Sequence, residues 1–361
     1  MSIFKKKKDD EEYEYDDEEL AELEERKPNS RKFKDLKPEN KKKRKEPVKP
    51  WGKKERLVVF YAFLATVIIA AGLAISARNW KLPGLPRISL PSFNLFKEET
   101  IVVGKKPVSQ EDQEKAKKAK EAFKETTKGL SGLYSFLIID LEKEISYGTA
   151  ETSVMQAASL IKLPTLAALY MEAEKGNIDL EAKYTLKQSD KLPGAGSLSG
   201  KPAGTVLTYR DLARLMGKQS DNTAFGIVRR LLGDEKINQV TAEIGMTKTS
   251  LAENTTTPQD IGLFFKKIWK KEIVSDDSRD EILGYLTDTI YENWIVAGIP
   301  DDIRVAHKYG RELHVVNDAG IVFSKYPFVL VIMSDGVVER EADEVIPKIA
   351  EKLFNIQTGK D

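Results

Sequence analysis

A run of residues without a charge, residues 57–77, constrains this chain more than any other feature. It reads LVVFYAFLATVIIAAGLAISA, and Arg56 and Arg78 border it. An apolar run of this length is about what the hydrocarbon core of a bilayer requires. It begins too far from the N-terminus for an ordinary signal peptide, and its apolar part is too long. The sequence therefore predicts a transmembrane helix that binds membrane lipid. The alternative is a buried core helix, and such helices seldom run past about 18 residues without a charge.

Positive charge flanks this run unequally. Residues 41–56 contain nine Lys or Arg, whereas residues 78–93 contain three. Positively charged loops remain in the cytoplasm during insertion. We therefore expect a single pass through the cytoplasmic membrane, with a cytoplasmic N-terminus and with everything after Ala77 extracytoplasmic.

The segments on either side of the run are predicted to lack a packed core. Residues 1–56 are mostly charged and contain too few apolar residues to offset the entropy lost on folding, so we expect a disordered cytoplasmic arm. This arm is either simply solvated or docks its basic part on anionic lipid. Residues 78–107 are expected to form an extended stalk, because prolines break regular structure. Those prolines are Pro83, Pro86, Pro91 and Pro107.

The remaining residues, 108–361, are predicted to form one α+β domain. Short apolar runs typical of strands lie near both of its ends, and helical patterns dominate from about 159 to 270. Further helices are expected near 109–127 and 339–355. This order favours an α/β sandwich whose sheet joins the two ends of the domain. The expected strands are 134–140, 145–147, 315–323 and 328–334.

Composition excludes several classes of function. The chain has no cysteine, which rules out disulfides, thiolate chemistry and Cys-based metal sites. Its two histidines, His307 and His314, do not suffice for a histidine-rich metal site, so we expect no metal and no cofactor. A net charge of +1 predicts no nucleic-acid partner.

The segment Ser159-Leu-Ile-Lys162 is the first candidate for chemistry. If a helix begins at Ser159, the two side chains share a face, and the positive end of the helix favours developing negative charge. A partly desolvated lysine can be a neutral base for the serine. The apolar neighbours of Lys162 favour this interpretation. The alternative is an N-cap serine with a solvated lysine, and Ser-x-x-Lys is common by chance.

Two further clusters follow at suitable distances. Ser220-Asp-Asn222 offers a hydroxyl and an amide that could relay protons and hold a substrate amide, although alone it is typical of a helix N-cap. His307-Lys-Tyr-Gly310 precedes the expected strand 315–323. A lysine there, on an edge strand, could bind a substrate carboxylate, and the glycine would let a substrate backbone approach. Alone, this cluster reads as an ordinary strand end.

Taken in order, the three clusters resemble those of the class A β-lactamase-like serine hydrolases, a family of penicillin-recognising serine enzymes. Ser-Asp-Asn follows Ser159 after 61 residues, and Lys-x-Gly follows Ser220 after 88. The neighbouring Thr255-Thr-Thr-Pro258, which opens a helix, agrees. The resemblance covers roughly residues 109–358. It implies a β-lactamase/transpeptidase-like fold, in which helices flank an antiparallel sheet beside an all-α subdomain.

The resemblance also implies a role for each residue. Ser159 is the implied nucleophile that forms an acyl-enzyme, Lys162 its base or proton relay, and Ser220 the shuttle to the leaving nitrogen. The implied oxyanion hole consists of the backbone N–H groups of Ser159 and Arg311, and such donors contribute about 3–4 kcal/mol each in related reactions. The implied substrate-binding residues are Asn222, Lys308 and Gly310.

The chain departs from the family pattern in two places. Tyr309 stands where the family has Thr or Ser, whose hydroxyl binds the substrate carboxylate. The loop before Thr255 is shorter and lacks the Glu-x-x-Leu-Asn segment, whose glutamate activates the deacylating water. Glu253 is either a displaced deacylating base or a solvated loop carboxylate. Without such a base, an acyl-enzyme is expected to form and persist.

The sequence thus predicts a membrane-anchored, extracytoplasmic serine hydrolase that acts through an acyl-enzyme on a β-lactam or a peptidoglycan-like amide. A D-alanyl-peptide-type hydrolase is an alternative within this class. A catalytically weak or inactive module is another, in which Tyr309 plugs the cleft and the domain binds cell-wall fragments or a protein. A purely structural tether of the envelope is the third.

Overall fold

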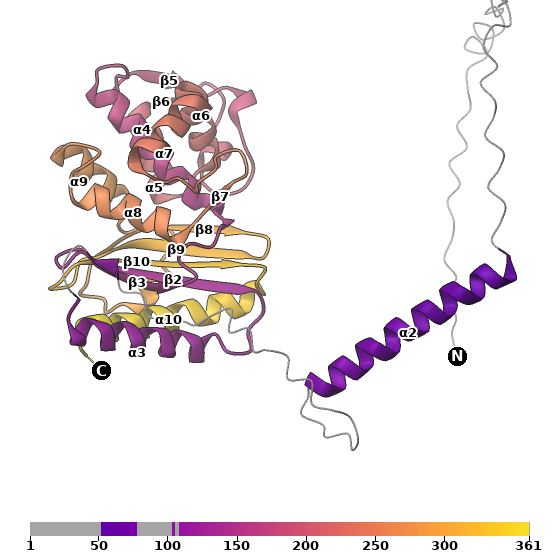
Figure 1. Cartoon of the computed structure of the whole chain (residues 1–361). Coiled ribbons are helices and arrows are strands. Elements are labelled where there is room, and N and C mark those ends of the chain that lie inside the picture. The colour runs from indigo at the N-terminus through magenta and orange to yellow at the C-terminus, as the bar shows by residue number, and fades with distance from the viewer. Residues whose placement is uncertain (1–51, 78–102, 105–107, 361) are drawn as a thin grey trace, which may run out of the picture. The chain divides into compact units, whose positions relative to one another are not determined.

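The computed structural model describes residues 52–77, 103–104 and 108–360 (Figure 1). The chain divides into two compact units, Met1–Ser92 and Phe93–Asp361. The predicted cytoplasmic arm up to residue 51 lies outside the described residues. So does the predicted stalk, apart from residues 103–104.

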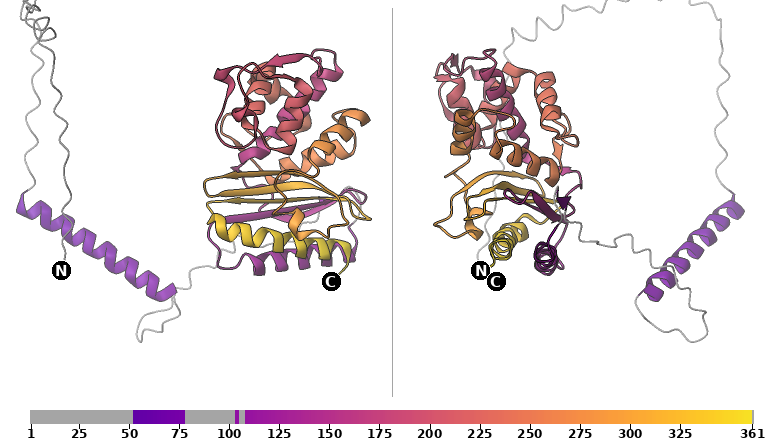
Figure 2. Two further views of the ribbon diagram at one scale, coloured as in Figure 1. Left: turned by 180° about the vertical axis from the view of Figure 1, so that it is seen from behind. Right: turned by 60° about the vertical axis from the view of Figure 1, so that its left-hand side comes forward.

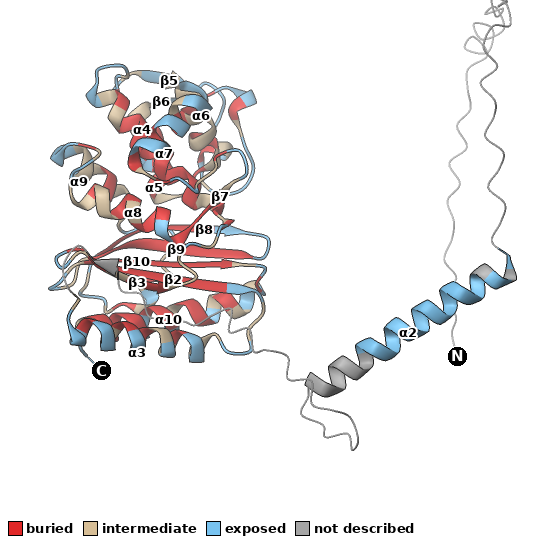
Figure 3. Ribbon diagram, viewed as in Figure 1, coloured by how far each residue is buried: buried red, intermediate tan, exposed pale blue. Residues whose placement is uncertain are grey.

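In the first unit, the helix α2 (Lys53–Ala77) includes the whole uncharged run. It begins at Lys53, so the last four residues assigned to the arm belong to the helix. The side chains of residues 57–70 are exposed, as the pale blue of this helix in Figure 3 shows. Within the described residues, no helix combines the length and the apolar character needed to cross a membrane.

The second unit is built on a six-stranded sheet in the order β1-β3-β2-β10-β9-β8, in which every neighbouring pair is antiparallel. Its central pair, β2 and β10, comes from the two ends of the domain, as predicted, and β8 forms one edge. The strands are β1 (Val103–Gly104), β2 (Leu133–Asp140), β3 (Ile145–Thr149), β8 (Val305–Glu312), β9 (Val315–Val322) and β10 (Phe328–Asp335).

The short strand β1 corrects the predicted domain boundary. Val103 pairs with Ser146, and Gly104 pairs with Ile145. We assigned both residues to the stalk, because two residues are too few to show the alternation that identifies a strand. The described part of the domain therefore begins at Val103 rather than at residue 108.

Helices cover both faces of the sheet, and the sequence of β2 shows why. Successive side chains of a strand point to opposite faces. Phe136 and Ile138 pack with residues of α3 (Gln110–Thr126) and α10 (Glu339–Thr358), whereas Leu137 and Ile139 pack on the other side with residues of α8 (Pro258–Trp269). Figure 2 shows α3 and α10 side by side under the sheet. A strand that is apolar at nearly every position suits burial on both faces.

A helical region occupies the other face and confirms the expected all-α subdomain (Figure 1). Short 3-10 helices and two small two-stranded sheets connect its parts. The helices are α4 (Lys162–Glu174), α5 (Tyr209–Lys218), α6 (Asn222–Leu232), α7 (Asp234–Ile244), α8 (Pro258–Trp269) and α9 (Asp276–Tyr285). The 3-10 helices here are η1 (Ala158–Ile161), η2 (Gln188–Asp190) and η3 (Leu198–Gly200), whereas η4 (Val296–Gly298) lies on the opposite face of the sheet and packs against α10. The small sheets pair β4 (Met155–Gln156) with β7 (Thr255–Thr256), and β5 (Lys183–Thr185) with β6 (Val206–Thr208).

Candidate active site

Ser159 lies in η1, the 3-10 helix directly before α4, so the α-helix does not begin at Ser159, which was the condition considered in the sequence analysis. Pro164 gives the physical reason. It has no N–H for the hydrogen bond to residue 160 that an α-helix beginning at Ser159 would need. The tighter 3-10 turn still leads into α4 at Lys162, so the two side chains meet.

The backbone before Ser159 is held from two sides. The side-chain amide of Asn317, on β9, donates to the carbonyl oxygens of Gln156 (2.8 Å) and Ala157 (3.2 Å). The N–H of Ala157 donates to the carbonyl oxygen of Asn254 (2.8 Å). Ala158 then adopts φ 47°, a conformation that costs a non-glycine residue about 1–3 kcal/mol and persists where its surroundings enforce it. The turn therefore presents a fixed, half-buried Ser159.

Lys162 lies at the centre of the polar contacts in the site. Its Nζ lies 3.1 Å from the Ser159 hydroxyl and 3.2 Å from the Ser220 hydroxyl, and it donates to Asn222 Oδ1 at 2.7 Å. It also donates to the Ser220 carbonyl oxygen. The structure thus brings together two pairs of residues, Ser159 with Lys162 and Ser220 with Asn222, that come from distant clusters of the sequence and were predicted to act together.

Burial lowers the pKa of Lys162 to about 8, although the charges of Asp221 and Glu312 oppose the shift. The side chain is only 4% exposed, which disfavours the charged ammonium. A lysine with such a pKa has a substantial neutral fraction near pH 8, and a neutral amine can accept the proton of a serine hydroxyl.

The helix cap and the catalytic arrangement coexist in the Ser220-Asp-Asn222 cluster. Asp221 is the N-cap of α6, because its carboxylate accepts from the N–H of Ala224 at 2.9 Å. The residues on either side of this cap face Lys162. Ser220 adopts φ 54°, another strained conformation at the site. The capping interpretation is therefore right for Asp221, and it places Ser220 and Asn222.

Lys308 approaches the same serine from the sheet. It lies on the edge strand β8, is 1% exposed, and its Nζ donates to the Ser220 hydroxyl at 2.8 Å and to the Tyr309 carbonyl oxygen at 2.6 Å. Burial, reinforced by the charge of Lys162, holds the pKa of Lys308 well below its ordinary range. The Ser220 hydroxyl therefore lies between two lysines and can pass a proton between them and a bound group.

Gly310 lets the edge strand touch η1. A Cβ on this residue would lie 2.8 Å from the backbone nitrogen of Ser159, closer than real Cβ atoms come. We predicted that this glycine admits a substrate backbone. The structure shows that it first admits the backbone of the serine turn itself.

The outer edge of β8 directs an N–H group to the same place. The N–H of His307 points away from β9, since it donates to the Leu286 carbonyl oxygen at 2.6 Å. Alternate residues of an antiparallel strand direct their N–H groups to the same side. Arg311, four residues on, therefore points its N–H off the edge, next to the turn of Ser159. This is the arrangement that an oxyanion hole requires.

The model of the beta-lactamase enzyme family matches residues 116–357, which is most of the second unit. The chain belongs to the beta-lactamase enzyme family. The beta-lactamase VEB-1 of Pseudomonas aeruginosa is 24% identical over 232 residues, which cover 56% of this chain and 78% of that protein. The family assignment confirms the predicted resemblance and identifies a β-lactamase-like serine hydrolase.

Solved structures agree in fold. A beta-lactamase from Sphaerobacter thermophilus has a TM-score of 0.64 at 25% identity. The matched region covers 68% of this chain and 98% of the Sphaerobacter chain. The structure of PBP-A has a TM-score of 0.64 at 24% identity, and the matched region covers 72% of this chain and 100% of the PBP-A chain. A PBP-A variant in an acyl-enzyme complex with penicillin G has a TM-score of 0.62 at 25% identity, over 67% of this chain and 97% of its own.

Tyr309, which stands where the family has Thr or Ser, has its side chain in the hydrophobic core. Tyr309 is 9% exposed, and its ring packs against Tyr291 (centroids 5.4 Å apart) and Trp294 (6.5 Å). These rings belong to the hydrophobic cluster that also includes residues of α3 and α10. The Lys308 ammonium lies 4.3 Å from the ring centroid. The ring therefore supports Lys308 from below. The arrangement in which Tyr309 plugs a cleft is not what the structure shows.

The shortened loop before Thr255 contributes Asn254 to the site rather than Glu253. The Glu253 side chain is exposed, and its backbone N–H donates to Ser250 Oγ at 3.2 Å. Asn254 adopts φ 51° and turns inward, where its Nδ2 donates to Glu312 Oε1 at 2.8 Å. Sequence reasoning gave Asn254 no role and did not consider Glu312, because their pairing joins a loop to a strand 58 residues away.

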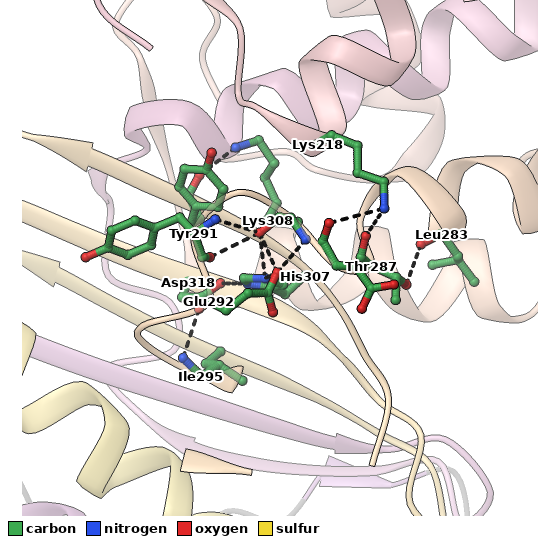
Figure 4. A network of polar contacts seen from close by, with 12 residues as sticks. Lys218, Leu283, Thr287, Tyr291, Glu292, Ile295, His307, Lys308 and Asp318 are labelled. Carbon is green, nitrogen blue, oxygen red and sulfur yellow. Dashed lines mark hydrogen bonds and ion pairs between the residues drawn. The ribbon is translucent and has the colours of Figure 1, made fainter. Parts of the chain in front are cut away.

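A buried network beside Lys308 was also missed. His307 is fully buried, and its Nδ1 lies 2.7 Å from Asp318 Oδ1 while its Nε2 lies 3.3 Å from Glu292 Oε1 (Figure 4). The second oxygen of Asp318 accepts from the N–H of Ile295 at 2.9 Å. Burial opposes the charged imidazole, but the Asp318 and Glu292 carboxylates outweigh it and raise the pKa of His307 to about 9. This network holds β8, and with it Lys308, against β9.

The described residues contain no group of three or more His, Asp or Glu side chains that could hold a metal ion.

Proposed function

We propose that the second unit is a serine acyl-transfer enzyme that forms an acyl-enzyme on Ser159 with a β-lactam or a peptidoglycan-like amide. One observation carries this proposal: an unbroken series of contacts runs from the Ser159 hydroxyl through Lys162 and Ser220 to Lys308. Lys162, Ser220 and Lys308 are each at least 96% buried, which is unusual for polar groups without a chemical role.

Acylation follows from this geometry. Neutral Lys162 accepts the proton of the Ser159 hydroxyl while Oγ forms a bond to the substrate carbonyl carbon. The carbonyl oxygen becomes an oxyanion and accepts hydrogen bonds from the backbone N–H groups of Ser159 and Arg311. The carbon–nitrogen bond then breaks, and the nitrogen takes a proton from the Ser220 hydroxyl, which Lys162 reprotonates.

Two groups orient the substrate in this proposal. The Asn222 amide, already fixed by Lys162, holds the substrate amide, and a substrate carboxylate would favour the protonated, positive form of Lys308. A β-lactam and a peptide ending in D-alanine both carry such a carboxylate. The names of two relatives support the first class: VEB-1 is a beta-lactamase, and the PBP-A variant holds penicillin G as an acyl-enzyme. A D-alanyl-peptide-type hydrolase fits the same groups.

The experiment that tests this function is the pH dependence of acylation by a fluorescent penicillin, measured on the full-length protein in detergent. Because the base must be neutral and the pKa of Lys162 is about 8, the rate should rise about tenfold per pH unit below that value and level off above it. Ser159→Ala is the blank. Labelling that is independent of pH, or that persists in the blank, would contradict the proposal and favour a binding module.

We also infer that residues 57–77 anchor the protein in the cytoplasmic membrane, with the charged arm inside and the enzyme outside. The support is the length of the uncharged run and the excess of basic residues before it. The protein should then remain in the membrane pellet after a carbonate wash, and external protease should digest only the part after Ala77. Release by carbonate would contradict the anchor without affecting the enzyme.

A further inference from the structure

Release of an acyl group from a serine needs a water molecule and a base that takes its proton. In this chain the shortened loop lacks the Glu-x-x-Leu-Asn segment, and Glu253 is exposed. The structure brings another carboxylate to the site, that of Glu312, the last residue of β8, which is also exposed but is held by a hydrogen bond from Asn254.

The direction of the Glu312 side chain follows from the strand. Residues two apart in a strand project to the same face. A Cβ on Gly310 would point at the backbone of Ser159 and at the Ala158 side chain, 2.8 and 3.2 Å away. The Glu312 side chain therefore leaves β8 toward the turn that carries Ser159. Its charge also opposes the low pKa of Lys162, as expected of a carboxylate near that amine.

Asn254 fixes the Glu312 carboxylate. Its Nδ2 donates to Glu312 Oε1, and since a carboxylate only accepts, this contact also fixes which end of the amide is the oxygen. The backbone oxygen of Asn254 accepts from Ala157, two residues before Ser159. Its side-chain oxygen is buried and has no hydrogen-bond partner among the described residues. That oxygen is closed to solvent, so Asn254 acts on the site through its Nδ2, which holds the Glu312 carboxylate.

We propose that Glu312 is the base that releases the acyl group from Ser159, and that the Asn254 amide holds its carboxylate in position. The water oxygen bonds to the ester carbon, and the Glu312 carboxylate takes its proton. The oxyanion is held by the N–H groups of Ser159 and Arg311. Collapse breaks the bond to Ser159 Oγ, which recovers a proton from Glu312, and the product leaves as a carboxylic acid.

This inference rests on the proposed acyl-enzyme function and is tested on the full-length protein in detergent. Benzylpenicillin is mixed with wild type, Glu312→Gln, Glu312→Asp and Glu253→Gln, and the acylated fraction is followed by intact-mass spectrometry. Removing a general base slows its step about 10²–10⁴-fold. The adduct on Glu312→Gln should therefore last at least about 100-fold longer than that on wild type, with acylation as fast or faster. Glu312→Asp should recover part of the loss.

The competing outcomes are distinct. Equal adduct lifetimes in wild type and Glu312→Gln would overturn the assignment of Glu312, and so would a long-lived adduct on Glu253→Gln alone. Asn254→Ala should also lengthen the lifetime without slowing acylation, which a role confined to holding the loop would not predict. If no variant forms an adduct, the acyl-enzyme function itself fails, and this inference fails with it.

Discussion

Replacing Lys162 by Ala should slow acylation of Ser159 by about 10³-fold or more. The change removes the one amine within hydrogen-bond distance of the Ser159 hydroxyl among the described residues, and a positioned base contributes about 10²–10⁴-fold. It also removes the donor that fixes Asn222 and contacts Ser220. The measurement is the rate of labelling by a fluorescent penicillin, with the unfolding temperature recorded in parallel.

A second variant tests whether Lys162 acts as a base or only as a positive charge. Lys162→Arg keeps the charge, but a guanidinium is not deprotonated in proteins, so it should be as slow as Lys162→Ala. Lys183→Ala, at an exposed lysine of β5, is the matched control and should acylate at the wild-type rate. An active Lys162→Arg would show that Lys162 does not act as the base.

Replacing Asp318 by Ala should lower the free energy of unfolding by about 3–5 kcal/mol, which is typical when one partner of a buried ion pair is removed. Asp318 and His307 are both fully buried, and the carboxylate also accepts from the N–H of Ile295. In a domain of this size about 1 kcal/mol shifts Tm by 2–4 °C. Tm should therefore fall by about 6–20 °C in a thermal melt.

The free energy of unfolding lost in Asp318→Ala should depend on pH, and the pKa of His307 sets the direction of that dependence. The folded-state pKa of about 9 is above the unfolded value of 6.5, so the pair stabilises fully below about pH 6.5 and loses this contribution as pH rises through about 9. The Tm difference between wild type and Asp318→Ala should narrow over that window. Asp302→Ala, at an exposed carboxylate, is the control. A difference that widens with pH would contradict a charged His307.

Much of the fold was readable from the sequence because local patterns agree with the final structure. The apolar run at Tyr134 has a residue for each face of the sheet, and it became the central strand β2. Ser109 predicted the start of α3, and its hydroxyl does accept from the N–H of Asp112. The order of the three clusters predicted which residues meet, since each retained its own local structure.

What the sequence did not reveal depends on pairs of residues that only the fold brings together. Asn254 and Glu312 are 58 residues apart, and neither belongs to a recognised pattern. Asn317 supports the turn before Ser159 from a strand 160 residues away. His307 was read as part of a strand end, because its partner Asp318 lies on the neighbouring strand. Side-chain direction was equally hidden, so Tyr309 could be placed on the core side only once β8 was paired with β9.

The most direct test of the central claim is to locate a penicilloyl group on the protein. The full-length protein is incubated with benzylpenicillin, quenched with acid and digested, and the modified peptide is sequenced by mass spectrometry beside Ser159→Ala. The account predicts one addition of an intact penicillin, on Ser159, that is absent from the variant. A wild-type protein that stays unmodified and leaves benzylpenicillin intact, or an addition that survives Ser159→Ala, would contradict it.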